Sequence, residues 1–426
     1  MTRAHLFLPT ALLLASGVLS AAAQSFLPKT IQFKGDSEHS DAELIAAAQL
    51  KKGVAMSIAE MNDHTKLLVD SGIYQDVSFT FNGQDLVVKL IPVTTLYPIR
   101  LENFPFATDK DLDQRLHDRL PLYHGTVPTS GSLLDGVSKE LEDQLSAKSI
   151  KATVIATPYT DLKLSKVTAM SFAITDPEVE VGTIQLTGVA DSQAPKARQA
   201  VSKVSGTSYS IDGSPSQIET ALLNLYGAQG YLEAKVKAIA QPAVLEPSDI
   251  RIPFSVPVEE GPQYKLAGVQ LTSDLIVTQA NLDKLPGLHL GDIASSTRLR
   301  AIWDLIERQY HNKGYMKARV QPTPAFDRSK GTVSYSVAVD AGPQYTMGKL
   351  KIINASDDLR ETILSLWKLP NGEVFNESEL RGFAVSHGAN QALERLIATV
   401  NLSYSLKFHD DSHTVDVDLT LERKHE

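Results

Sequence analysis

The sequence predicts an α+β fold of about five tandem β-α-α-β-β modules, each a three-stranded sheet with two helices on one face. Two motifs recur along the chain at nearly the same spacing. The residues around Gly261 are echoed 81 positions later around Gly342, and those around Tyr231 are echoed 84 positions later around Tyr315. Because independent motifs rarely share a spacing by chance, this recurrence indicates structural repeats of roughly 80 residues.

A third pattern, a short run of alternating apolar and polar residues, marks the strand that opens each unit. Its occurrences are Thr30–Gly35, Ile99–Asn103, Ile184–Gly188, Val269–Thr272 and Leu350–Asn354. The modules are therefore predicted to span residues 24–94, 95–177, 178–262, 263–343 and 344–426, and the second and fifth are the most divergent.

The fourth unit shows the order of its elements most clearly. Tyr264–Leu271 alternates as a strand, and a short helix is expected around Ala280–Leu285. A longer helix follows, with one apolar stripe made of Leu299, Ile302, Trp303, Ile306 and Tyr310. Strand alternation is predicted to resume at Met316 and to finish in a hairpin that ends near Val339.

Glycine and proline mark the places where the chain must change direction. Glycines that allow a positive φ are expected to end the long helices of three units, at Gly72, Gly230 and Gly314. Tyr231 and Tyr315, next to Gly230 and Gly314, are expected to pack back on their helices, and Tyr74 lies at the same junction of the first unit, one residue further on. Short Gly-Pro turns join successive units at Gly261-Pro262 and Gly342-Pro343. Because such short linkers allow little movement, the modules are predicted to form an extended, semi-rigid arm.

The first 23 residues have the features of a secretory signal. Arg3 precedes the apolar stretch Leu6–Leu19, and small residues then favour cleavage after Ala23. No later segment has the roughly 18 apolar residues that a spanning helix needs, so the mature chain is predicted to have no direct membrane span. The chain has no cysteine, which excludes disulfides, and its formal net charge of -9 argues against a nucleic-acid partner.

These motifs carry a resemblance to a known family. The order β-α-α-β-β, Gly-Tyr before the second strand and the sequence Glu260–Tyr264 between units make the chain similar to tandem POTRA (polypeptide-transport-associated) domains. In that family such strings form the periplasmic arm of outer-membrane assembly factors of the BamA and TamA kind, where they precede a membrane barrel. No barrel is expected here after the fifth unit. The resemblance implies a periplasmic protein that associates with the outer membrane through a partner.

The second strand of each module is expected to be a sheet edge, because the family places the last strand in the centre. Edge strands have unpaired N–H and C=O groups that can pair with an extended peptide. The residues predicted to line three such edges are Val77 and Phe79, Leu232, Ala234 and Val236, and Met316, Ala318 and Val320. In the alternative interpretation the edges are only solvated, and charges such as Lys235 and Lys317 discourage pairing.

Catalysis, cofactors and metals have no support in the sequence. It contains no nucleophile-elbow motif, no glycine-rich phosphate loop and no HExxH motif. The metal-capable residues His409–His413 lie between two alternating segments and are predicted to form a hairpin turn. Asp109, Asp111 and Asp113 fit a helix N-terminus better than a calcium loop. We therefore predict a protein that is not an enzyme and has no cofactor and no metal site.

The predicted function is a periplasmic polypeptide-binding scaffold, or a chaperone-like component, of outer-membrane protein assembly or transport. Its partners would be an outer-membrane barrel protein, an assembly complex or unfolded clients. One alternative is a structural adaptor that docks a single folded envelope partner. A third, less favoured, is a secreted enzyme whose site is not visible in the sequence. Binding to many unfolded peptides would favour the scaffold, and one stoichiometric partner would favour the adaptor.

Overall fold

The structure, a computed structural model, describes residues 25–105, 111–161, 163–246, 248–272, 276–285, 287, 289–386 and 400–423. The predicted signal segment and Asp109 lie outside the described residues. The described chain forms two compact units: one contains the residues up to Thr183 together with Ser205–Ser214 and Ala240–Phe254, and the other contains the rest. Within these ranges no helix is both long enough and apolar enough to cross a membrane.

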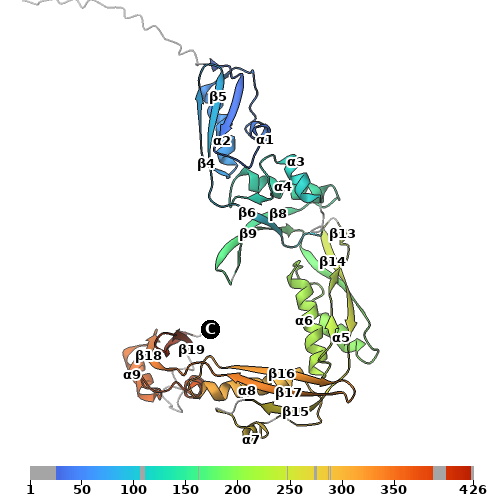
Figure 1. The fold of residues 1–426 in the computed structure, drawn as a ribbon, viewed down its shortest axis with the longest axis vertical. Helices are drawn as coiled ribbons and strands as arrows, with labels where there is room; N and C mark the ends of the chain where they lie inside the picture. Colours follow the sequence, from blue (N-terminus) through green and yellow to red (C-terminus); the bar gives the residue numbers. More distant parts are fainter. Residues whose placement is uncertain are drawn as a thin grey trace, which may run out of the picture. The chain divides into compact units, whose positions relative to one another are not determined.

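Five sheets, each with its own helices, follow one another along the chain (Figure 1), and we call each sheet with its helices a module. Module 1 contains β2 (Thr30–Lys34), α1 (Asp41–Ala47), α2 (Ile58–Asp70), β4 (Tyr74–Phe81) and β5 (Asp85–Pro92). Module 2 contains β6 (Tyr97–Leu101), α3 (Leu112–Arg119), α4 (Ser132–Ser146), β8 (Thr153–Asp161) and β9 (Lys166–Asp176). Module 3 begins with β10 (Val179–Thr187), α5 (Ala194–Val201) and α6 (Gly213–Ala228) and ends with β14 (Asp249–Glu259).

The last two modules repeat this order. Module 4 contains β15 (Lys265–Leu271), α7 (Gln279–Leu282), α8 (Ser296–His311), β16 (Arg319–Asp327) and β17 (Thr332–Asp340). Module 5 contains β18 (Thr346–Ile353), α9 (Asp357–Leu366), α10 (Glu377–Ser386), β19 (Val400–His409) and β20 (Thr414–Arg423). The predicted tandem β-α-α-β-β fold is thereby confirmed. The module boundaries and the extended form of the arm stay predictions.

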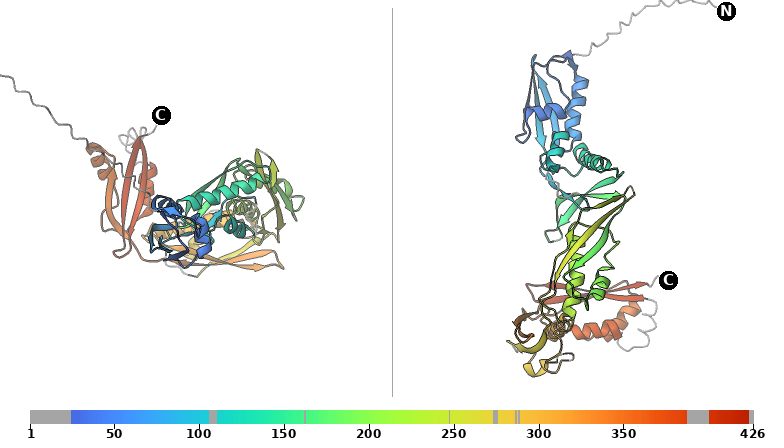
Figure 2. Two further views of the ribbon diagram at one scale, coloured as in Figure 1. Left: turned by 90° about the horizontal axis from the view of Figure 1, so that it is seen from above. Right: turned by 90° about the vertical axis from the view of Figure 1, so that its right-hand side faces the viewer.

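The last strand of a module lies in the centre of its sheet. In module 1, β5 runs parallel to β2 and antiparallel to β4. Alternate residues of β5 face the helices: Leu86, Val88 and Leu90 are buried, whereas Lys89 is exposed. The helices of module 1, blue in the right-hand view of Figure 2, lie on one face of its strands. Burial of each such aliphatic side chain stabilises the module by about 1.5–3 kcal/mol.

The long helix of module 4 buries the stripe that the sequence predicted. Leu299, Ile302, Ile306 and Tyr310 are buried, and Trp303 is partly buried against the same core. The helix ends at His311, three residues before Gly314. Helix α8 and β16 pack side by side (Figure 1).

Modules 1 and 2 contain short strands beyond the predicted three. In module 2 the short β7 (Thr126–Val127) pairs antiparallel with β6, which gives a four-stranded sheet in the order β7-β6-β9-β8. Module 1 gains a separate two-stranded pair, β1 (Ser25–Phe26) with β3 (Met56–Ser57). Both additions are two-residue strands, too short to produce a detectable period in the sequence.

The second strand of module 3, predicted as one continuous edge, is broken into three pieces. These are β11 (Lys235–Val236), β12 (Ile239–Ala240) and β13 (Val244–Glu246), and all of them pair with β14. Pro253 and Pro257 lie within β14, and a proline cannot donate to the ladder. The first gap lies opposite Pro257, whose carbonyl accepts only a long hydrogen bond of 3.4 Å from the N–H of Lys237. The central prolines therefore account for the interruptions.

The two recurring sequence motifs contact one another where modules meet. The N–H of Tyr345 donates to the carbonyl of Gly314 at 2.7 Å, and the N–H of Tyr264 donates to the carbonyl of Gly230 at 2.9 Å. Gly314 and Gly230 have φ of 82° and 85°, and a Cβ on Gly314 would lie 2.7 Å from the carbonyl oxygen of Tyr345. The helix-ending glycine and the tyrosine that opens the next module are therefore two halves of one joint. That contact explains why their motifs share a spacing.

The aromatic residues after these glycines pack back on their helices, as expected. Tyr231 meets Tyr226 of α6 edge to face, with ring centroids 5.9 Å apart. Tyr315 meets Tyr310 of α8 at 6.2 Å. These contacts fix the end of each long helix against the turn that follows it.

Each of the two joints has an ion pair beside its buried tyrosine, and the signs of the charges in this pair are exchanged between the joints. At the joint of modules 3 and 4, Glu233 accepts from Arg328 at 2.5 Å and from the hydroxyl of buried Tyr264. At the joint of modules 4 and 5, the Nζ of Lys317 donates to Asp410 at 2.6 Å. The same Asp410 oxygen accepts from the hydroxyl of buried Tyr345 at 2.8 Å. The acid thus comes from the earlier module at one joint and from the later module at the next.

Candidate polypeptide-binding edges

The second strand of every module pairs only with the central strand among the described elements. Module 1 has the order β2-β5-β4, module 4 β15-β17-β16 and module 5 β18-β20-β19. One side of each of these strands therefore has no strand partner in the described chain. What that side presents depends on which residues direct their N–H and C=O groups outward.

The edge of module 1 presents an uninterrupted row of backbone groups. Across the turn after β4, the N–H of Asn82 donates to the carbonyl of Asp85 at 3.1 Å. Antiparallel pairs alternate from that point, so Val77, Phe79 and Phe81 direct their N–H and C=O away from β5. None of the eight residues of β4 is proline. The side chains of Val77 and Phe79 are half-buried toward the helices, so the outward groups are those of the main chain.

The edge of module 4 is blocked at three of its outward positions. The N–H of Val320 donates to Glu307 Oε1 of α8 at 3.0 Å, so it points away from β17. Every second residue of β16 shares that direction, and the next two such residues are Pro322 and Pro324. Of the outward positions in β16, only Phe326 then offers a free N–H direction to an added strand. Prolines on an edge are a known means of preventing strand addition.

The carboxylate that covers Val320 belongs to a repeated arrangement. In module 2, Glu142 of α4 accepts from the N–H of Val154 at 3.0 Å. In module 3, Glu219 of α6 accepts from the N–H of Ala238 at 2.9 Å. In each case a glutamate of the long helix accepts from an outward N–H of the edge. No carboxylate of the described chain makes this contact with β4.

The edge of module 2, β8, is partly blocked against strand addition. The outward positions that follow Val154 are Ala156 and Pro158, so a proline removes one donor there. The edge of module 5, β19, contains no proline over its ten residues. Residues 387–399, which precede it, lie outside the description. Among the edges whose surroundings are described, β4 presents the longest open row.

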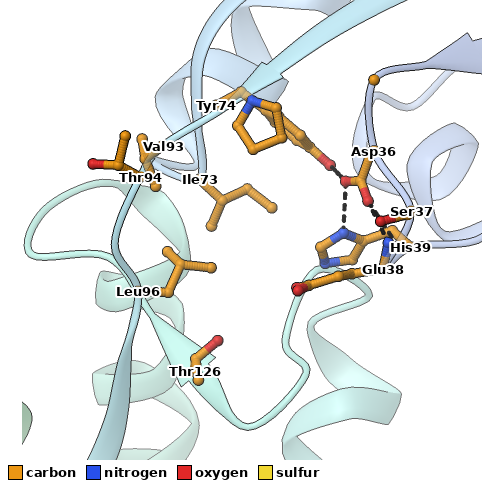
Figure 3. A pocket seen from close by; sticks show the side chains of 12 residues that line it. Asp36, Ser37, Glu38, His39, Ile73, Tyr74, Val93, Thr94, Leu96 and Thr126 are labelled. Atoms are coloured by element: carbon orange, nitrogen blue, oxygen red, sulfur yellow. Dashed lines mark hydrogen bonds and ion pairs between the residues drawn. The ribbon is translucent and has the colours of Figure 1, made fainter.

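A pocket of about 370 Å³ opens beside the start of β4 (Figure 3). On one side lie apolar side chains that include Ile73, Val93 and Leu96. On the other side, the buried Asp36 accepts hydrogen bonds from the Tyr74 hydroxyl, from His39 Nδ1 at 2.8 Å and from two backbone N–H groups. The pocket therefore borders an ordered polar network that ties the loop after β2 to the first residue of β4.

Ionisation within this network follows from burial and hydrogen bonding. Burial, together with the hydrogen bond to Asp36, raises the pKa of Tyr74 far above its usual range. Burial alone would raise the pKa of Asp36, but the hydrogen bonds from Tyr74 and from the backbone of His39 and Glu38 outweigh it and lower the pKa. Asp36 is thus held as a carboxylate with its acceptor sites occupied. Such a group positions the loop and is not available as a general base.

Comparison with known proteins identifies the repeat. The sequence profile of the POTRA family, described as "Surface antigen variable number repeat", matches residues 264–342. The chain therefore contains a POTRA domain at residues 264–342.

Relatives of this POTRA-domain protein include BamA. Over 384 residues the chain is 20% identical to the outer membrane protein assembly factor BamA of Buchnera aphidicola subsp. Acyrthosiphon pisum (strain APS), which covers 86% of this chain and 60% of that protein. The chain thus spans less than two thirds of that relative's length. Among solved structures, POTRA3-5 of Haemophilus influenzae BamA matches at 18% identity and a TM-score of 0.47, covering 58% of this chain and 98% of that one. POTRA4 of the same protein matches at 29% identity and a TM-score of 0.18, covering 19% and 95%.

Several residues predicted to lie on POTRA edges are placed elsewhere. Met316 and Ala318 precede β16, which begins at Arg319, and Leu232 and Ala234 precede β11. The prediction that a strand starts at Met316 was therefore wrong.

The side chains of these residues serve the POTRA cores instead. Met316 is buried in the core of module 5, and Leu232 packs on the core of module 4, so each contacts the module after its own. Ala318 is buried in the core of its own module.

The remaining predicted edge residues do lie in edge strands. Val77 and Phe79 are in β4, Val236 is in β11 and Val320 is in β16. Whether any of them binds a polypeptide stays a prediction. The residues that the sequence analysis missed are those that distinguish one edge from another: the helix glutamates and the outward prolines. Pro322 and Pro324 are visible in the sequence two positions apart, which was an available signal that β16 is a protected edge.

The segments proposed as turns or helix starts are also described. His409 ends β19, and the residues that follow it form the turn to β20, which begins at Thr414. Asp111 is the N-cap position of α3, and Asp113 lies in its first turn, where the Tyr123 hydroxyl donates to its carboxylate at 2.7 Å. The turn after His409 and the described residues Asp111 and Asp113 have the structure that the sequence predicted.

Proposed function

We propose that this POTRA-domain protein is a periplasmic polypeptide-binding scaffold in outer-membrane protein assembly, and that it captures extended segments by strand addition to β4. The observation that carries the proposal is the open row formed by Val77, Phe79 and Phe81. The similarity to an outer membrane protein assembly factor supports the process in which the scaffold works. The role is one of binding, without catalysis, and the protein acts at the outer membrane through its partners.

The hydrogen-bonding capacity of β4 suits reversible capture. Three residues that each present one N–H and one C=O allow about six hydrogen bonds to an added strand, and each contributes about 0.5–1.5 kcal/mol net. Ordering a flexible peptide opposes this gain by about 2–5 kcal/mol. The balance gives weak binding, which suits a component that holds a segment and then releases it.

The test compares proline with alanine at one outward position. Phe79→Pro removes both the aromatic side chain and the outward N–H, whereas Phe79→Ala removes only the side chain. The ladder to β5 does not use the N–H of Phe79, so both variants keep the sheet paired. We expect fluorescent peptides with the alternating pattern of a membrane strand to bind Phe79→Pro at least tenfold more weakly than Phe79→Ala. Equal affinities would exclude β4 as the binding edge.

The breadth of binding separates the scaffold from the adaptor. A panel of unrelated strand peptides should bind the wild-type chain with similar micromolar affinities if main-chain groups provide the contacts. Capture from solubilised envelope of one folded, stoichiometric partner, together with no binding to the panel, would support the adaptor instead.

A further inference from the structure

We propose that Glu43, His117 and His124 form a binding site for a divalent transition-metal ion, with Zn²⁺ as the best fit. Glu43 lies in α1 of module 1, His117 in α3 of module 2 and His124 in the loop after α3. Their ligand atoms lie within 4.8 Å of one another. This inference concerns a second site and does not depend on strand addition at β4.

The ligand atoms converge on one point. His117 Nε2 is 3.4 Å from Glu43 Oε1, and His124 Nε2 is 3.2 Å from that same oxygen. Two ligand atoms bound at about 2.0–2.1 Å to a tetrahedral zinc ion are separated by about 3.3–3.4 Å. These two separations match two edges of a zinc coordination tetrahedron, and all three ligand atoms lie within 4.8 Å of one another.

The carboxylate is oriented by a helix cap. Glu43 is the third residue of α1, and its Oε2 accepts from the backbone N–H of Ser40 at 2.6 Å and from the Ser40 hydroxyl at 2.8 Å. This capping box occupies one oxygen and leaves Oε1 directed at the two imidazoles. Glu43 can thus act as a single-oxygen ligand without losing its role in the helix.

The tautomer of His117 is fixed by a contact on the far side of its ring. Nδ1 lies 3.0 Å from the carbonyl oxygen of Tyr123, which can only accept a hydrogen bond, so Nδ1 carries the hydrogen. Nε2 is then the ring nitrogen that faces Glu43 Oε1, and either a proton on Nε2 or a metal ion can join these two atoms. A hydrogen bond from the other ring nitrogen to a backbone carbonyl is the usual support of a metal-ligating histidine.

The second imidazole is held by its neighbours. The ring of His124 meets that of His39 with centroids 4.6 Å apart and that of His117 at 5.1 Å. His39 is in turn held between Asp36 and the carbonyl of Leu122, with its Nε2 at 3.2 Å from that oxygen. These ring contacts place His124 against the rest of the cluster.

The site is open to solvent on one side. The side chains of His117 and His124 are 38% and 33% exposed, and both line a surface pocket with Gln114 and Gly125. An ion can enter from this side, and water can occupy the fourth position. Two histidines and one carboxylate form a ligand set that favours zinc over calcium or magnesium, which prefer oxygen ligands alone. Because the ligands come from modules 1 and 2, a bound ion would crosslink the two modules.

The test is metal binding to the purified full chain by isothermal titration and, with Co²⁺ as a probe, by visible absorption. We expect one Zn²⁺ per chain at micromolar or tighter affinity, and tetrahedral Co²⁺ bands. His117→Ala or His124→Ala should weaken binding at least tenfold and abolish the bands, whereas the control His289→Ala, at an exposed position outside the cluster, should change neither.

Two outcomes would overturn the site. The first is the absence of stoichiometric binding to the wild-type chain. The second is binding that survives His117→Ala and His124→Ala, which would assign the ion to other surface groups. Glu43→Gln guards against a folding defect, since the amide oxygen can still cap α1. Weakened Zn²⁺ binding in this variant with an unchanged metal-free melting curve supports the site, and unchanged binding contradicts the role of Glu43.

Discussion

Strands β4 and β16 occupy the same place in their modules but differ in what they offer to a partner. Both are second strands at a sheet edge, of eight and nine residues. The outward positions of β4 are Val77, Phe79 and Phe81, whereas those of β16 begin with Val320, which Glu307 covers, and continue with two prolines. A shared fold therefore does not give the modules a shared binding capacity. The binding capacity of a module depends on every second residue of its edge strand, because only those residues direct their N–H and C=O outward.

The largest expected effect comes from giving β16 the open row of β4. In the double variant Pro322→Thr with Pro324→Thr, two outward N–H groups return beside that of Phe326, so three donors face outward as in β4. We expect the chain to gain a second peptide site, measured as a doubled stoichiometry in isothermal titration. Thr323→Val serves as the control, since it changes the residue between the prolines without adding a donor. An unchanged stoichiometry would show that outward donors alone do not make an edge competent.

A smaller effect is expected from removing Glu307, the helix glutamate that accepts from the N–H of Val320 in β16. No glutamate of the described chain makes this contact with β4. Glu307→Ala leaves the N–H of Val320 without its charged acceptor, which should lower the free energy of unfolding of module 4 by about 1–2 kcal/mol. Asp304→Ala is the matched control, because Asp304 is an exposed acid on the same helix. Denaturant unfolding of the two variants gives the comparison. Equal stabilities would mean that the glutamate contact contributes nothing to the fold.

The smallest expected effect concerns the turns that connect β4 to β5 and β16 to β17. The turn after β4 bonds to its own module, through Lys29 and Thr30, whereas the turn after β16 is tied to Glu233 of the preceding module by Arg328. Hydrogen bonds from Arg328 and Tyr264 lower the pKa of Glu233 to about 2 from an ordinary 4.5. A depressed carboxyl pKa contributes stability above the unfolded-state value, and this is lost as pH falls through the folded-state value.

The contribution of Glu233 should therefore disappear between about pH 4.5 and pH 2. Glu233→Gln should melt at a lower temperature than the wild type at pH 6, and the two melting curves should converge toward pH 2. Asp327, whose pKa is also about 2, titrates in both proteins and so does not affect the difference between them. A constant difference in melting temperature across this range would contradict the assigned pKa.

The fold could be predicted from the sequence because its signals are periodic. The stripe of α8 and the alternation of β17 each extend over nine or more residues, and the repeat added independent copies of the same pattern. Elements of two residues, such as β7, leave no period to detect. The interruption of the second strand in module 3 was encoded by Pro253 and Pro257, but those prolines lie in the partner strand and act across the sheet.

The candidate sites were harder to predict from the sequence. They depend on the direction in which each backbone N–H points and on contacts between residues that are far apart in the chain. Leu232 and Met316, which were predicted to lie in edge strands, alternate with their neighbours like strand residues, yet they precede the strands and their side chains pack on the next module. Which residues of an edge strand direct their N–H outward follows from the register of its pairing with the central strand, and the sequence alone does not give that register. The cluster of Glu43, His117 and His124 joins residues of two modules more than 70 positions apart, so no local spacing indicated it.

The exchanged charges at the two joints have a consequence for how the repeat array can change. Recombination between similar repeats removes or copies one unit at a time. Loss of residues 234–317 would bring Glu233 to the position of Lys317, beside Asp410, and two carboxylates would meet at one tyrosine hydroxyl. Duplication of the same segment would bring Lys317 beside Arg328, where two cations would meet. Either change would thus bring like charges together at a joint where the present succession of modules pairs opposite charges.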